Sequence, residues 1–312
     1  MRGLAAICAI AAFAFLGLGT TSFAQQAIPL TFKFAPGDVL QYDITISGSG
    51  GLTAADAKAT PVDIQGTCSL VQTITKILPD GSGRIESRIP SGEVSIRFGQ
   101  DQVRFSYANG SFRWFANGKE FSPPQADLAK LPLFGTPLAY TMFPDGRVSD
   151  IAFADPRVMA ELAKSLPGFD LSRISATGEP TFPGRPVSVG ETWRSSVQLS
   201  PLGPALPLSL SMSRTLESYE DKGGFGLAKI VGFAEARYQG SGAPIIPAQD
   251  VSIGISELRQ TITSTEYFNT TSGRLLRGDY DLAFSTQISA KAGDQEKSGG
   301  IAARIRVNVQ GR

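Results

Sequence analysis

Few side chains in this sequence have the types and spacing that catalysis or metal binding requires. Asp279 and Asp281 alternate within Gly278–Phe284, so in a strand both carboxylates would lie on one face, where they can serve as acid and base or bind calcium. Charged strand residues more often face water, and we interpret the pair in that way. The 312 residues include no histidine. The usual Ser-His and Cys-His pairs and most catalytic zinc sites are therefore excluded.

Cysteine usage gives no better candidate for chemistry. Cys8 lies in an N-terminal apolar run, so the remainder of the chain keeps only Cys68 and can form no internal disulfide. Cys68 belongs to the strand-like run Thr67–Thr75 and has no base near it in sequence, which favours a buried structural thiol. The sequence contains no phosphate-binding loop, metal-ligand cluster or nucleophile elbow. We expect no enzymatic activity, no cofactor and no metal.

The N-terminus has the layout of a secretory signal. Arg2 precedes the uncharged apolar run Leu4–Leu18, and Ser22-Phe23-Ala24 matches the small-x-small pattern of a cleavage site. The run is shorter than the roughly 20 residues that a membrane-spanning helix needs. We expect cleavage between Ala24 and Gln25, and export to the periplasm or the cell exterior.

Charge restricts the partners of the mature chain. Without the signal segment, which contains one arginine and no acidic residue, the 29 basic side chains fall to the number of acidic ones, 28. A neutral chain lacks the basic field that nucleic acid or an anionic surface requires. No second long apolar run follows, so we expect no transmembrane helix. An apolar ligand or another envelope protein remains as a partner.

The sequence predicts a mainly β protein, because glycine (34) and proline (20) are frequent and apolar residues alternate with polar ones. Asn-Gly pairs at 109–110 and 117–118 are strong hairpin signals. They predict the pairs Tyr107 with Phe112, Phe105 with Trp114, and Trp114 with Phe121. A further loop around Gln100-Asp101 would pair Phe98 with Val103, Ile96 with Phe105 and Val94 with Tyr107. These registers gather the aromatic side chains on one face of a four-stranded meander.

Other elements follow from capping and periodicity. Ile301–Gln310 alternates strictly and predicts a half-buried strand. The best helix candidate is Asp155–Leu166, with Asp155 as its cap, Pro156 in its first turn and Pro167-Gly168 after its end. Its apolar stripe consists of Val158, Met159, Leu162 and Leu166. A shorter helix candidate is Gln125–Leu131. We expect the longer helix to cover or gate the face around Trp114, because large apolar faces are rarely open on soluble monomers.

Three landmarks recur in the same order along the chain. They are Gly37–Tyr42 with Gly190–Trp193, Ser69–Ile74 with Ser211–Leu216, and Tyr140–Val148 with Tyr267–Leu275. We interpret them as a duplication, with a signal peptide at 1–24, a first β half at 25–150, a helix and connector at 151–180, and a second β half at 181–312. The predicted fold is a strongly curved antiparallel sheet or open β-barrel with one or two short helices over its apolar face.

The stretch Pro183–Trp193 resembles a signature of exported bacterial proteins in a family without an assigned function, P-x-x-P-V-x-V-G-[DE]-x-W at mid-chain. Pro36–Tyr42, Asp145–Val148 and Phe268–Leu275 match the other turns of that family. Glu191 stands where the family more often has Asp. The layout is also distantly similar to the half-open β-barrels of periplasmic lipoprotein carriers, which have helices across a concave sheet. These motifs are turn signals, so they imply a fold and assign no catalytic residue.

The leading functional hypothesis is a non-enzymatic envelope protein that binds an apolar or amphipathic ligand, such as a lipid, in a β-lined concavity. The candidate ligand-binding residues are Phe105, Phe112, Trp114, Phe121, Met159 and Leu162. The alternative is a structural or protein-interaction module in which the same aromatic face is plain core. A hydrolase that uses carboxylates ranks third.

Overall fold

The structure, a computed structural model, describes residues 27–54, 59–108, 110–121, 136–158, 160, 179–198, 209–239, 244–247, 252–292 and 295–312. The predicted signal segment, the helix candidate at 125–131 and most of the longer helix lie outside these residues. No described helix has the length and hydropathy that crossing a bilayer would require.

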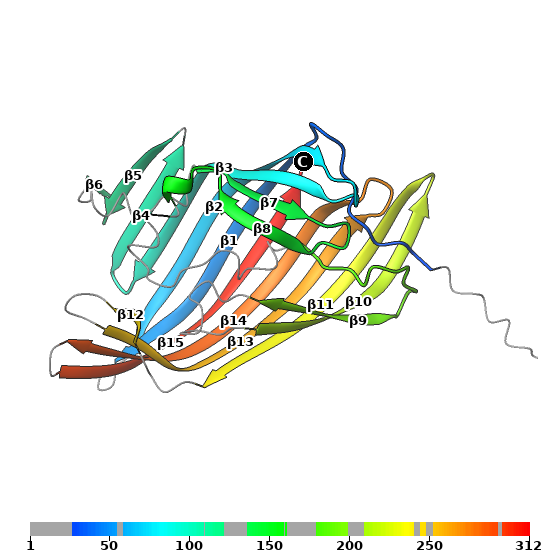
Figure 1. Cartoon of the computed structure of the whole chain (residues 1–312). Coiled ribbons are helices and arrows are strands. Elements are labelled where there is room, and N and C mark those ends of the chain that lie inside the picture. The colour runs from blue at the N-terminus through cyan, green and yellow to red at the C-terminus, as the bar shows by residue number, and fades with distance from the viewer. Residues whose placement is uncertain are drawn as a thin grey trace, which may run out of the picture.

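Most of the described residues lie in strands. They are β1 (Val39–Ala54), β2 (Thr60–Ile77), β3 (Gly83–Phe98), β4 (Asp101–Ala108), β5 (Ser111–Ala116), β6 (Lys119–Phe121), β7 (Leu138–Met142), β8 (Val148–Phe153), β9 (Thr192–Gln198), β10 (Ser209–Lys222), β11 (Phe225–Gln239), β12 (Pro244–Pro247), β13 (Ser252–Asn269), β14 (Arg274–Ala292) and β15 (Gln295–Gly311). Twelve of the described strands form one antiparallel path, β6-β5-β4-β3-β2-β1-β15-β14-β13-β11-β10-β9, and both predicted halves therefore belong to one sheet (Figure 1).

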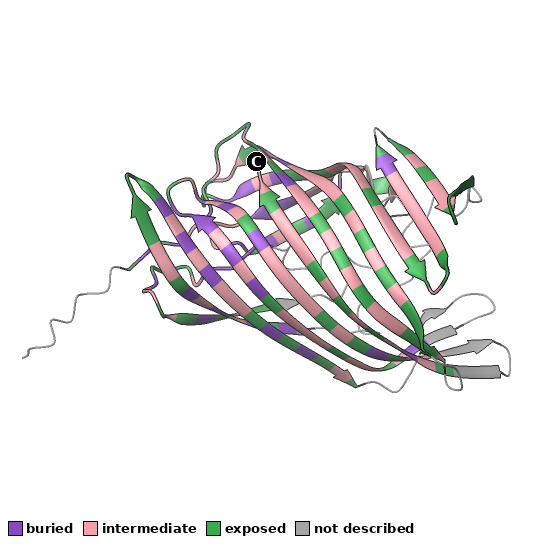
Figure 2. Ribbon diagram, turned by 180° about the vertical axis from the view of Figure 1, so that it is seen from behind, coloured by how far each residue is buried: buried purple, intermediate pink, exposed green. Residues whose placement is uncertain are grey.

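The two faces of this sheet differ in polarity. On β15, the odd-numbered residues from Ile301 to Val309 are partly buried, whereas Ala302, Arg304 and Arg306 are exposed. Because the strands pair in register, the same alternation continues into β1 and β14. Figure 2 shows the result as alternating exposed and partly buried bands along the strands. The predicted half-buried strand at the C-terminal end is confirmed.

The apolar face is the concave one. Gln72 on β2 donates to Glu179 at 2.6 Å, and Arg214 on β10 donates to Thr181 at 3.0 Å. Six strand spacings separate β2 from β10, which is about 29 Å in a flat sheet. Residues 179 and 181 lie at most about 7 Å apart along the chain. Only strong curvature toward this face brings both strands to one short segment, and the predicted curved, open sheet is confirmed.

Strand β3 divides the sheet at one end. Its first part, Gly83–Ser87, pairs with β7, and its second part, Ser91–Phe98, pairs with β4. Pro90 lies between the two parts, and its missing N–H suits a break in the ladder. Strands β7 and β8 therefore leave the main path and lie in front of it in Figure 1.

We call the region enclosed under these strands the closed end. It contains one cluster of buried apolar side chains from the sheet, from β7 and β8, and from the segments before β1 and β9. Its members are Ile28, Leu30, Phe32, Ile74, Ile85, Tyr140, Met142, Val148, Ile151, Phe153, Phe182, Val187, Trp193, Leu216, Ala228, Ile230 and Phe268. Side chains from both predicted halves meet here, so the core is shared between them.

Glycines lie on the concave face where neighbouring strands leave no space for a side chain. A Cβ atom at Gly50 on β1 would lie 2.3 Å from the carbonyl oxygen of Ala302 and 2.7 Å from Cβ of Ala303. At Gly66 on β2 it would lie 3.0 Å from a side-chain carbon of Val94. Because the sheet curves toward this face, side chains on it converge, and no space for a Cβ atom remains at these two positions.

The meander agrees with two of its three predicted hairpins. The pairs Tyr107 with Phe112, Phe105 with Trp114, and Trp114 with Phe121 are all observed. The register predicted for the upstream hairpin is wrong by two residues. The observed pairs are Phe98 with Asp101, Ile96 with Val103, and Val94 with Phe105. The turn is Gly99-Gln100, and Gly99 takes a φ of +60°, which tightens the loop. A shift of two keeps every side chain on its predicted face.

The described part of the longer helix candidate is its first turn. The backbone N–H of Arg157 donates to Oδ1 of Asp155 at 3.0 Å, as a cap requires. Val158, the first residue of the predicted apolar stripe, packs against the cluster at the closed end. Met159, Leu162 and Leu166 lie outside the described residues, so cover of Trp114 by this helix stays a prediction.

Two of the recurring landmarks make matching hydrogen bonds. The N–H of Gly37 donates to the carbonyl of Ile74 at 2.8 Å, and the N–H of Gly190 donates to that of Leu216 at 2.7 Å. The return bonds, from Ile74 to Asp38 and from Leu216 to Glu191, measure 2.9 and 3.1 Å. Each landmark therefore ties the start of one strand to its neighbour in the same way.

Candidate ligand-binding face

One row of residues crosses the concave face through all twelve strands of the main path. From β6 to β9 it consists of Phe121, Trp114, Phe105, Val94, Gly66, Ile46, Val307, Tyr280, Ser264, Gly232, Arg214 and Trp193. The row is aromatic at one side, aliphatic in the middle and polar where it reaches the closed end. A single surface of the sheet thus offers both apolar and polar contacts.

Four of the candidate residues lie together, and we call them the aromatic region: Phe105, Phe112, Trp114 and Phe121. Ring centroids are 5.5 Å apart for Phe105 and Trp114 and 6.3 Å apart for Trp114 and Phe121. Phe105, Phe112 and Trp114 are only partly buried, and Phe121 is 41% exposed. The indole N–H of Trp114 is buried without an acceptor among the described residues. The region is therefore less enclosed than the cluster at the closed end.

A polar cluster lies at the other side of the row, made of Gln72, Tyr140, Glu179, Thr181, Arg214 and Glu266. At its centre, Nε of Arg214 lies 3.2 Å from Oε2 of Glu266, and the two side chains are 5% and 0% exposed. The guanidinium also donates to Thr181 and Ser195, both at 3.0 Å. A buried ion pair of this kind persists only where further hydrogen bonds offset its desolvation.

The second part of the polar cluster starts at Gln72 on β2. Its amide nitrogen donates to the hydroxyl of Tyr140 at 2.9 Å and to Oε1 of Glu179 at 2.6 Å. Glu179 and Thr181 belong to one segment, residues 179–187, which we call the strap. The strap therefore joins both parts of the cluster across the concave face.

The strap is held by close backbone contacts. The indole N–H of Trp193 donates to the carbonyl of Thr181 at 2.8 Å, and Ile28 forms a β-bridge with Val187. Gly146, with a φ of +84°, comes so close that a Cβ atom there would lie 2.1 Å from the carbonyl oxygen of Pro180. Two residues of the Pro183–Trp193 signature, Val187 and Trp193, thus help to fix the strap in place.

Two tyrosines at the edge of the cluster have perturbed acidities. Burial raises the pKa of Tyr42 above its usual range, the Glu179 carboxylate raises it further, and Arg274 opposes the shift. Burial also raises the pKa of Tyr280 well above its usual range, and the charge of Glu266 acts in the same direction. Both phenols therefore stay neutral at physiological pH and can donate hydrogen bonds.

Sequence reasoning missed the polar cluster. Its residues come from strands far apart in the chain, and no spacing motif connects them. One signal was present. Arg214 lies on the same face of β10 as the apolar Met212 and Leu216, so the alternation predicts that its charged side chain faces the interior. Glu266 is likewise in phase with Phe268.

Cys68 lies on the concave face of β2, opposite Ile44 and Gly92. It is partly buried, which is less than the predicted full burial, because Gly92 leaves one neighbouring position without a side chain. Burial nevertheless raises the pKa of its thiol above the usual range.

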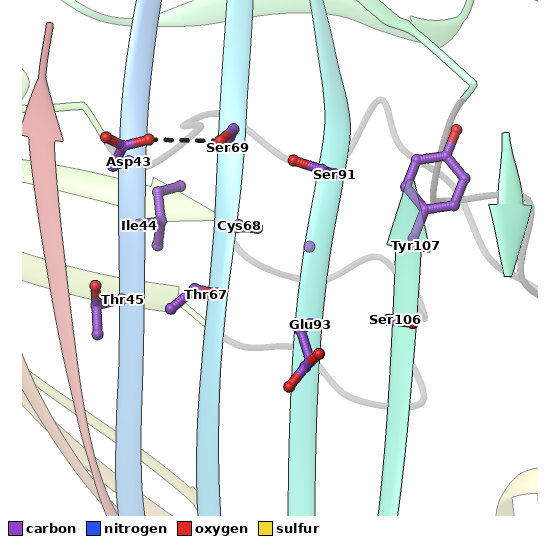
Figure 3. Close-up of a pocket in the computed structure, with 11 residues that line it drawn as sticks. Asp43, Ile44, Thr45, Thr67, Cys68, Ser69, Ser91, Glu93, Ser106 and Tyr107 are labelled. Carbon is purple, nitrogen blue, oxygen red and sulfur yellow. Dashed lines mark hydrogen bonds between the residues drawn. The ribbon is translucent and has the colours of Figure 1, made fainter. Parts of the chain in front are cut away.

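A shallow depression of about 460 Å³ lies over β1, β2, β3 and β4 around this position (Figure 3). Its carboxylates are already engaged. Asp43 makes two bonds of 2.6 Å with Arg312 and accepts a 3.4 Å bond from Ser69, and Glu93 lies 3.7 Å from Arg104. These pairings are ordinary for a polar sheet surface, so we place the candidate site elsewhere on the sheet.

The sequence-predicted carboxylate pair is also engaged in ion pairs. Asp281 lies 3.2 Å from Arg304 and 3.6 Å from Arg306, and Asp279 lies 2.9 Å from Arg277. The described residues contain no group of three or more cysteine or acidic side chains placed to hold a metal ion.

Comparison with known proteins gives distant likenesses only. Neither a protein-family model nor a curated protein sequence matches the chain. Among solved structures, one on lipid–protein interactions in lipovitellin aligns with 90% of this chain and 25% of its own, at 12% identity and a TM-score of 0.42. Pseudomonas aeruginosa OccK7 aligns over 88% of this chain and 99% of its own, at 7% identity and a TM-score of 0.24.

An outer membrane channel from Pseudomonas putida F1 aligns over 89% of this chain and 97% of its own, at 7% identity and a TM-score of 0.21. This chain thus spans a quarter of the lipovitellin chain it resembles.

Proposed function

We propose that the protein is a non-enzymatic, exported envelope protein that binds an apolar or amphipathic ligand, such as a lipid, against the concave face of its sheet. The observation that carries the proposal is the row across that face. It stays apolar from β6 to β15, and its aromatic region remains partly exposed, whereas the apolar cluster at the closed end is buried. Large apolar surfaces of this kind on soluble proteins are usually interaction sites.

The alternative is a structural or protein-interaction module whose aromatic face is plain core. Two variants on β5 separate the two hypotheses. Trp114 points to the concave face, and its neighbour Phe115 points to the other, where the Arg104 guanidinium lies 4.2 Å from its ring centroid. Trp114→Ala should weaken binding of the apolar fluorescent probe diphenylhexatriene, and Phe115→Ala should leave it unchanged. Absence of probe binding in the parent protein would favour the module.

A direct test examines the protein as its host makes it. Native mass spectrometry, with organic extraction of the purified protein, should reveal a bound lipid that denaturation releases. A clean apoprotein mass, together with no probe binding, would sink the carrier hypothesis.

Export belongs to the same proposal and has its own test. Intact mass or N-terminal sequencing of the mature protein should show a start at Gln25. A chain that retains Leu4–Leu18 would show that the apolar run is an anchor.

A further inference from the structure

Two polar side chains of β13 are enclosed at the closed end but incompletely hydrogen-bonded. Glu266 is fully buried; its Oε2 pairs with Arg214, whereas its Oε1 accepts no hydrogen bond from any described residue. The hydroxyl of Ser264, which is 5% exposed, also has no partner in the described part of the chain. Such groups are rare in native proteins, and each calls for a water, an ion or a ligand.

Their position connects them to the apolar row. Ser264 pairs with Tyr280 on one side and with Gly232 on the other. A Cβ atom at Gly232 would lie 2.4 Å from the Ser264 hydroxyl, so this hydroxyl lies over bare backbone. Beyond Tyr280 the row continues through partly buried Val307 and Ile46. The free polar atoms therefore adjoin the start of the aliphatic stretch.

The charges at this place favour one kind of head group. Glu266 presents one carboxylate oxygen to the Arg214 guanidinium and the other, Oε1, to no donor among the described residues. An N–H or O–H donor would satisfy the free oxygen of Glu266, while a carboxylate or phosphate would be repelled by it.

We propose that Glu266 and Ser264 form the head-group end of the ligand site and select a single-chain amphiphile whose head donates N–H or O–H hydrogen bonds. The inference rests on the proposed function and names its ligand class. The chain would lie over Val307, Ile46 and Val94. Three strand spacings separate β15 from β3, a distance of about 14 Å. One extended acyl chain has a similar length, because it fills half of a bilayer core that is about 30 Å thick.

The test compares ligands of one chain length at pH 7. A long-chain alkylamine, a monoacylglycerol and a fatty acid each displace diphenylhexatriene, a probe without a polar head, from the parent protein. The amine and the monoacylglycerol should bind about tenfold more tightly than the fatty acid, as expected for one charge-assisted or buried hydrogen bond. Their relative affinities distinguish an ammonium head from a hydroxyl head.

Variants locate the effect. Glu266→Gln should remove most of the preference for the amine and keep binding of diphenylhexatriene. Ser264→Ala, which leaves the ion pair intact, should weaken the monoacylglycerol several-fold and provides the test if the first variant does not fold. Thr263→Ala is the matched control, because Thr263 is the exposed neighbour of Ser264 on the opposite face, and it should change no affinity.

The outcomes separate the two proposals. If the parent protein binds diphenylhexatriene but shows no preference among the three heads, the head-group site is wrong, its free atoms contact only water, and the proposed function stands. Tighter binding of the fatty acid would also overturn the head-group site. If the parent binds neither the probe nor any amphiphile, the proposed function itself fails.

Discussion

The closed end and the aromatic region share one concave face but differ in enclosure. At the closed end, Phe268 is fully buried against Phe32 and Phe182 at centroid distances of 5.2 and 4.8 Å. In the aromatic region, the rings of Phe105 and Trp114 contact each other yet stay partly exposed. The difference indicates that the closed end contributes more to stability, and it leaves the rings of the aromatic region accessible, as the proposed binding function requires.

The largest effect should come from the buried ion pair. Arg214→Met leaves the Glu266 carboxylate enclosed without its partner, so we expect the free energy of unfolding to fall by about 3–5 kcal/mol in chemical denaturation. The matched control is Arg237→Met, because Arg237 and Glu235 form an exposed pair on the other face, and its removal should cost less than about 1 kcal/mol. Equal losses would remove the distinction between enclosed and exposed pairs.

Truncated aromatic rings test the comparison directly. Phe268→Ala should lower the free energy of unfolding by about 3–5 kcal/mol, because it leaves a cavity in a packed core. Trp114→Ala should cost less than half of that, since its ring is less enclosed. If both substitutions lower the free energy of unfolding equally, the aromatic region is part of the core. That result would support the hypothesis of a structural module.

Alkaline pH should weaken the closed end through its tyrosines. Burial raises the pKa values of Tyr42 and Tyr280 in the folded state above the ordinary value of 10.0. The unfolded chain therefore loses these protons first, and stability that is complete below pH 10 falls above it. The expected slope is about 1.4 kcal/mol per pH unit for each phenol.

Denaturation at pH 9 to 11.5, followed by tyrosinate absorbance, measures this effect. Tyr42→Phe should reduce the slope of stability against pH by the contribution of one phenol. A parent protein whose Tyr42 ionises while it remains folded would contradict the burial of this phenol.

The smallest effect should come from Cys68, between the two regions. Cys68→Ser replaces a partly buried thiol by a hydroxyl and should cost about 1 kcal/mol, at the low end for such a change. Because burial raises the pKa of the thiol, labelling of the folded protein at pH 7 should be slow. Rapid labelling by a bulky reagent would show that this part of the concave face is open.

Local sequence signals account for the meander and the aromatic region. Asn-Gly turns fix their own registers, so the pairing of Phe105 with Trp114 could be predicted without any long-range information. The upstream hairpin was placed two residues off because Gln100-Asp101 looked like the turn, whereas the left-handed Gly99 starts it. The alternation of apolar and polar residues on β15 was likewise predictable from the local sequence.

Long-range geometry accounts for what could not be predicted. The polar cluster forms because curvature brings Gln72 and Arg214, six strands apart, to one strap. The order of the strands and the curvature of the sheet depend on contacts between residues far apart in the sequence. No local sequence pattern therefore predicted the polar cluster or the division of β3. The inward phase of Arg214 and Glu266 was the single hint available.

The crowded glycines of the concave face imply that the two surfaces of β1 differ in mutational tolerance. Side chains on the outer surface diverge, so Ser47 and Ser49 have room for larger replacements. On the inner surface they converge, and Gly50 cannot gain even a methyl group without displacing Ala302 or Ala303. A saturation scan along β1 should therefore show a two-residue rhythm, with substitutions accepted at one position and rejected at the next. We therefore expect substitutions to accumulate during evolution on the outer surface of such a fold, while the inner surface preserves its shape.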